Sequence, residues 1–60
     1  MSKYLIESMR EYQEKNKVSD RELSRLLGVH WNTIYNWRHG LFKPSGLAEK
    51  RIREFLIKNL

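Results

Sequence analysis

A short segment between two glycines, residues 28–40, carries the side chains best suited to recognition chemistry. Inside it, Ile34 and Trp37 have the i, i+3 spacing of a buried helical stripe. At about 100° per residue, Asn32 and Asn36 fall opposite this stripe. Each asparagine amide offers a donor and an acceptor side by side, which match the N6 and N7 atoms on the edge of adenine. The segment therefore predicts a helix whose outer face can read base pairs; an ordinary surface helix is the alternative.

Aromatic and imidazole side chains flank the two amides. Tyr35 and His39 lie beside them on the helical wheel, and Trp31 lies at the edge. Trp31 can place its ring against a thymine methyl group or a sugar, or it can cover the edge of the core, and both interpretations stay open. His30 stands at the expected N-cap, so we expect a structural role or a phosphate contact for it rather than metal ligation.

A second short helix is expected directly before this segment, over residues 19–27. Ser19 and Glu22 have the spacing of a capping box, in which each side chain bonds the other residue's backbone N–H. Gly28 can then adopt the left-handed conformation of a tight turn between the two helices. This order of elements is a helix-turn-helix pattern. The expected buried stripe of the first of these helices consists of Leu23, Leu26 and Leu27.

Longer amphipathic segments flank the helix pair, at residues 2–16 and at about 46–58, where Ser45 supplies the N-cap. The sequence thus predicts one all-α domain over residues 1–60, a small bundle of four to five helices with the helix-turn-helix at about 19–39. The residues expected to face the core are Leu5, Ile6, Met9 and Tyr12 in the first segment and Ala48, Ile52, Phe55 and Leu56 in the last.

Composition narrows the classes of function. The chain has no Cys and two His, with no acidic pair in a plausible pocket and no Gly-rich phosphate loop, so we expect no enzyme, no cofactor and no metal. Its net charge is +5, and residues 31–60 hold most of the excess, which favours polyanionic partners. No apolar run is long enough to span a membrane and no signal core is apparent, so we expect a cytoplasmic protein of a prokaryotic cell or phage-infected host.

A set of residues in one register resembles the Cro/repressor-type (Xre-type) helix-turn-helix domains, over roughly residues 5 to 56. The resemblance implies a lambda-repressor-like bundle that binds double-stranded DNA sequence-specifically, with the helix after Gly28 in the major groove. The residues that carry it are Ser19, Glu22, Leu23, Ser24, Leu27, Gly28, Val29, Thr33, Ile34, Trp37, Gly40, Pro44 and Ser45, with Met9, Arg10, Tyr12 and Val18 upstream.

The resemblance also implies a set of contacts. The family often has an acid at position 38, paired with the Arg at position 10, whereas both positions are basic here. We therefore expect Arg38 to face phosphate and Arg10 to find a carboxylate of the first or second helix. The expected base-reading residues are Trp31, Asn32, Asn36 and Tyr35, and the expected DNA-backbone contacts are Arg21, Thr33, Arg38, Lys43 and Arg25.

One such domain touches few base pairs, so we expect a homodimer, which could form only on DNA, at a pseudo-palindromic operator. The resulting hypothesis is a transcriptional regulator, a repressor of phage or mobile-element type, without a small-molecule effector. The alternatives are a protein-interaction module and a DNA-recruiting subunit of a recombination or excision complex. The candidate dimer patch consists of Leu41, Phe42, Ile57 and Leu60.

Overall fold

The computed structural model describes residues 2–59, and the secondary structure in that range is entirely helical. The expected all-α fold is confirmed, and the described residues hold four helices without a further one in the 39–45 loop. The helices are α1 (Ser2–Asn16), α2 (Asp20–Leu27), α3 (Trp31–Arg38) and α4 (Gly46–Lys58).

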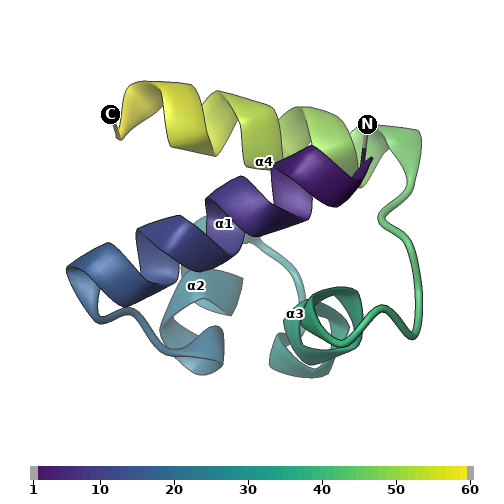
Figure 1. Cartoon of the computed structure of the whole chain (residues 1–60), viewed down its shortest axis with the longest axis horizontal. Helices are drawn as coiled ribbons and strands as arrows, with labels where there is room; N and C mark the ends of the chain where they lie inside the picture. Colours follow the sequence, from purple (N-terminus) through teal and green to yellow (C-terminus); the bar gives the residue numbers. More distant parts are fainter. Residues whose placement is uncertain (1, 60) are drawn as a thin grey trace.

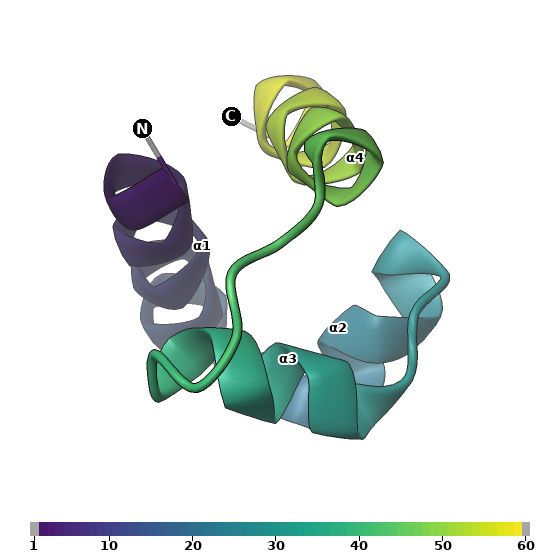
Figure 2. The same ribbon diagram turned by 90° about the vertical axis from the view of Figure 1, so that its right-hand side faces the viewer.

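The helices form two pairs. The terminal helices α1 and α4 pack on each other, and the short helices α2 and α3 pack on each other beneath them (Figure 1). The view from the side shows α3 along the lower edge of the molecule, with no other helix on its outer side (Figure 2). This arrangement supports α3 from within and leaves one of its faces to solvent.

The core takes one fully buried side chain from each helix, namely Met9, Leu23, Ile34 and Ile52. Leu27 and Trp37 complete the buried cluster. Each of these residues lies on the stripe that the helical period predicts, because burial of one apolar face supplies most of the stability of so small a chain.

Side chains of the terminal helices close the core from above. Tyr12 and Phe55 meet edge to face, with ring centroids 5.0 Å apart, and both are only partly buried. The other expected core residues of α1 and α4 are also partly buried against the cluster, and they are Leu5, Ile6, Ala48 and Leu56.

The placement of Leu26 in the buried stripe of α2 was wrong. Its side chain is 54% exposed, whereas Leu23, Ser24 and Leu27 are buried. The buried face of α2 is turned toward Ser24, whose hydroxyl donates to the Arg21 carbonyl at 2.6 Å and so needs no partner outside the helix. At about 100° per residue, this rotation carries Leu26 out to solvent.

Three of the helices end in the same way, with one residue in the left-handed region. These residues are Lys17 (φ 55°), Gly28 (φ 74°) and Gly40 (φ 70°). In each case the N–H of the next residue donates to the carbonyl five positions earlier. This is the 6→1 hydrogen bond of a Schellman motif, and it satisfies a free carbonyl of the last turn. The bonds run from Val18 N to Gln13 O (2.9 Å), from Val29 N to Ser24 O (3.1 Å) and from Leu41 N to Asn36 O (2.9 Å).

The helix starts follow the sequence closely. The hydroxyl of Ser19 accepts from the N–H of Glu22 at 3.1 Å, and that of Ser45 accepts from the N–H of Ala48 at 3.2 Å. Of the capping box expected at Ser19 and Glu22, only the bond from the Glu22 N–H to the Ser19 hydroxyl forms among the described residues. The Glu22 side chain makes no return bond to the Ser19 N–H. None of the helices in the described range is long and apolar enough to cross a membrane.

The helix ends generate the first prediction. Lys17→Gly should raise the free energy of unfolding by about 1 kcal/mol, because glycine adopts positive φ without the Cβ clash. Gly28→Ala should lower it by about 1–2 kcal/mol through the same term, since an added Cβ there meets only Arg51 Nη1, at 3.7 Å. Urea unfolding followed by circular dichroism measures both changes.

Gly46→Ala is the matched control, because Gly46 lies in the first turn of α4 without positive φ and with open space around it. Alanine should be neutral or stabilising there. A Lys17→Gly protein no more stable than the original would contradict the assignment of strain to Lys17.

Candidate nucleic-acid interface

Burial of one side of α3 decides which of its residues face solvent. Ile34 is fully buried and Trp37 is 6% exposed, and both contact the core against α2. Opposite them, Asn32 and His39 are exposed. The buried pair thus fixes the rotation of the helix. Asn32 and His39 lie outward as the helical wheel places them, whereas Asn36 is half-buried.

The four expected base-reading residues all lie on α3, with differing exposure. Asn32, Tyr35 and Trp31 are exposed, whereas Asn36 is half-buried. Among the described residues, neither asparagine amide has a hydrogen-bond partner. Two unpartnered amides one turn apart are available to an external ligand.

The start of α3 is fixed by His30. Its Nδ1 accepts a hydrogen bond from the backbone N–H of Asn32 at 3.1 Å, so the expected N-cap is confirmed. Because Nδ1 is an acceptor here, the neutral ring carries its proton on Nε2 and can donate it elsewhere. The described residues contain no group of three or more His, Asp or Glu side chains placed to hold a metal ion.

Ring contacts order the aromatic side chains of this face. The rings of His30 and Trp31 lie 5.6 Å apart, and those of Tyr35 and His39 lie 4.2 Å apart, each pair tilted by about 30–35°. These contacts restrict the rings to defined positions beside the amides, so the face is partly preorganised.

The Arg21 side chain, from α2, also joins this face. Its Cζ lies 5.4 Å from the centroid of the Trp31 ring. Sequence reasoning named both residues but did not pair them. They are ten positions apart on different helices, and only the angle of the Gly28 turn brings them together, so helical period gave no signal.

Arg25 is exposed on α2 one turn after Arg21. The first turn of α2 also holds two acids, Asp20 and Glu22. Both complement the positive end of the helix dipole, so the start of this helix does not favour a phosphate. The positive charge near α3 therefore comes from arginine side chains.

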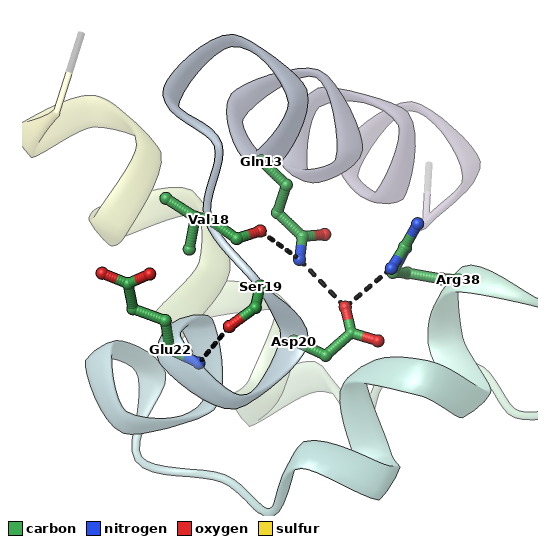
Figure 3. A network of polar contacts seen from close by, with 6 residues as sticks. All are labelled: Gln13, Val18, Ser19, Asp20, Glu22 and Arg38. Atoms are coloured by element: carbon green, nitrogen blue, oxygen red, sulfur yellow. Dashed lines mark hydrogen bonds and ion pairs between the residues drawn. The ribbon is translucent and has the colours of Figure 1, made fainter.

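Arg38 does not take the position that we expected for it. Its Nη1 donates to Asp20 Oδ1 at 2.7 Å, and the same oxygen accepts from Gln13 Nε2 at 2.9 Å (Figure 3). Gln13 Nε2 also donates to the carbonyl of Val18 at 3.2 Å. This network ties α1, α2 and the end of α3 together, and it gives the half-buried Arg38 a carboxylate partner.

The expectation for Arg10 was wrong as well. Arg10 is exposed, and within the described residues it makes no ion pair. It lies around a shallow hollow with Glu7, Glu11 and Glu14 of its own helix. A solvated arginine gains little from such neighbours, so no contact holds it in place. Of the two arginines, only Arg38 has a carboxylate partner among the described residues, and that partner is Asp20.

The remaining expected backbone contacts lie at the two sides of α3. Thr33 is half-buried on α3, and Lys43 is exposed in the loop that follows. Lys43 borders a surface hollow of about 320 Å³ together with Phe42 and Arg38. The structure thus gives both residues access to solvent on the side of α3.

The candidate dimer residues do not share one surface. Leu41 and Phe42 are 61% and 66% exposed in the loop before α4. Ile57 is 68% exposed but belongs to the last turn of α4, at the other end of that helix from the loop, where it borders a hollow together with residues of α1. Leu60 lies outside the described residues. The described residues of the expected dimer patch therefore lie in two separate exposed regions.

Comparisons with known proteins find no match among family models, curated proteins or solved structures.

The network around Asp20 generates the second prediction. Asp20→Ala should lower the free energy of unfolding by about 1–2 kcal/mol, because it removes two hydrogen bonds to a carboxylate and leaves Arg38 without its counter-ion. Asp20→Asn should cost less, since the amide oxygen can still accept from both donors and only the negative charge is lost. Urea unfolding measures both effects.

Glu22→Ala is the matched control, because it removes an exposed carboxylate from the same helical turn and tests the dipole alone. A double-mutant cycle with Arg38→Met isolates the pair energy. Equal losses for Asp20→Ala and Glu22→Ala would show that the network adds no stability.

Proposed function

We propose that the chain is a sequence-specific DNA-binding regulator of transcription with a helix-turn-helix of the Cro/repressor type. The observation that carries the proposal is the outer face of α3, where the Asn32 and Asn36 amides are unpartnered. The buried Ile34 and Trp37 fix that face outward. An α-helix with its side chains is about 10–12 Å wide and fits the major groove, which is about 12 Å wide.

Within this proposal the contacts divide by chemistry. Asn32 and Asn36 bind adenine edges in the groove, and the ring edges of Trp31 and Tyr35 contact thymine methyl groups or neighbouring bases. The backbone contacts come from Arg21, Arg25, Thr33 and Lys43. Arg38 makes no direct contact with DNA in this proposal, since Asp20 already binds and neutralises its guanidinium.

The length of α3 supports a dimer. Eight residues extend about 12 Å, which covers only a few base pairs. Useful affinity then requires two copies on half-sites about 34 Å apart, and a pseudo-palindromic operator. A repressor that occludes a promoter, of phage or mobile-element type, is the simplest regulator with these properties.

A protein-interaction module is the second candidate. The exposed pair Leu41 and Phe42 favours it, because two adjacent apolar side chains in a solvated loop are typical of a contact surface. A DNA-recruiting subunit of a recombination or excision complex would combine this surface with the α3 face.

Selection from random duplexes, read by sequencing at two salt concentrations, tests the proposal. We expect a two-fold symmetric motif rich in A·T pairs, with binding that weakens steeply as salt rises, because phosphate contacts release counterions. Salt-sensitive binding without any motif would leave a non-specific nucleic-acid binder. No retention at either salt concentration would contradict the proposal.

Asn36→Ala should relax the preference at one position of the motif and weaken binding to the preferred site by about 1–3 kcal/mol. Thermal unfolding should change little, because the half-buried amide makes no hydrogen bond within the described part of the chain. Phe42→Ser is the matched variant in the loop and should leave the base preference intact. If Phe42→Ser abolished all binding while Asn36→Ala left binding unchanged, the interaction module would be favoured.

A further inference from the structure

We propose that Arg21 and Trp31 form one phosphate-binding unit, in which the indole ring holds the guanidinium against a phosphate of the DNA backbone. The inference rests on the proposed function and gives Trp31 a second role. Trp31 is then a positioning residue, and Arg21 makes the contact. The ligand is a phosphodiester group of a duplex, bound by the guanidinium of Arg21 where it lies against the Trp31 ring.

The geometry is that of a cation–π pair. Arg21 Cζ lies 5.4 Å from the ring centroid of Trp31, inside the limit of about 6 Å for a favourable contact. A guanidinium above a ring is attracted through its charge and keeps N–H donors at its edge. Those donors fit two phosphate oxygens at once.

Within the described residues, no carboxylate forms an ion pair with Arg21. Its sequence neighbours are Asp20 and Glu22, but Asp20 is bound by Arg38 and Gln13. Glu22 is exposed, and within the described residues it forms no ion pair with Arg21. The Asp20 network therefore has a second effect, since it turns the nearest acid inward and leaves the Arg21 charge for an external anion.

The ring is itself held in place. Trp31 is the first residue of α3, directly after the His30 cap, and its ring lies 5.6 Å from the imidazole. It is 38% exposed, so much of its surface is in contact with the protein. An arginine on a fixed ring loses less conformational freedom on binding than a free one, which raises affinity through preorganisation.

Arg25 provides an internal comparison. It is exposed on the same helix one turn later, and no aromatic ring in the described range lies under it. If Arg25 also meets phosphate, its contribution does not depend on Trp31. The inference thus predicts that Arg21 and Trp31 are coupled, whereas Arg25 and Trp31 are not.

The test measures binding to one fixed duplex by fluorescence anisotropy across a salt series. Arg21→Ala should reduce the slope of log K against log salt by about 0.9, which is the loss of one phosphate contact. Between 50 and 200 mM salt, the loss of affinity in Arg21→Ala should therefore be smaller than the loss in the original protein by a factor of about 3.5. Trp31→Leu should lose at least half of the same slope although the arginine remains, and Trp31→Phe should keep it.

Arg21→Ala combined with Trp31→Leu should lose no more slope than Arg21→Ala alone, whereas Arg25→Ala combined with Trp31→Leu should be additive. Circular dichroism and thermal unfolding check that every variant folds; both side chains are exposed, so we expect no large change. A full slope in Trp31→Leu with a changed base preference would overturn this inference and leave the proposed function standing. Failure of the original chain to bind any duplex would overturn both.

Discussion

The carboxylate of Asp20 is the contact on which the placement of α3 depends. One oxygen accepts from Gln13 on α1 at 2.9 Å and from Arg38 on α3 at 2.7 Å, so three helices meet at a single atom. The apolar core supplies one fully buried residue per helix, and in α3 the buried Ile34 and Trp37 decide which face points inward. The directional polar contact at the end of α3 adds a second constraint and ties that end to α1 and α2. Two buried atoms in the described range stay without partners there, Gln13 Oε1 and Arg38 Nε.

The sequence predicts most of the local structure, because that structure depends on neighbours along the chain. The capping serines, the glycine at position 28 and the stripes through Met9, Ile34 and Ile52 all act within a few residues, and each lies where the pattern puts it. Lys17 is the exception among the helix ends. A lysine in the left-handed region is held by the tertiary fold that follows it, and no local signal marks it.

The candidate site was less predictable, because its contacts join different helices. Arg10, Arg38 and Asp20 are separated by ten or more residues, and only the folded backbone decides which cation receives the acid. The misplaced Leu26 has a related cause: the face that α2 buries runs through Leu23, Ser24 and Leu27, and the packing of the helices, not the apolar period of α2 alone, selects it. Spacing identifies which residues share a helix, whereas helix packing decides which of them meet.

The same packing separates stability from recognition. The side chains that fix α3 are Ile34, Trp37 and Arg38, and they point inward or toward Asp20. Those proposed to contact DNA lie on the other side and make few bonds to the rest of the chain. Because these inward contacts hold α3 without using its outer face, the residues of that face can change at little cost in stability. Surface substitutions away from helix caps and hydrogen-bond networks usually alter the free energy of unfolding only slightly. Only the first turn of α3 joins the two functions, since the His30 cap and the Trp31 ring belong both to the frame and to the proposed phosphate site.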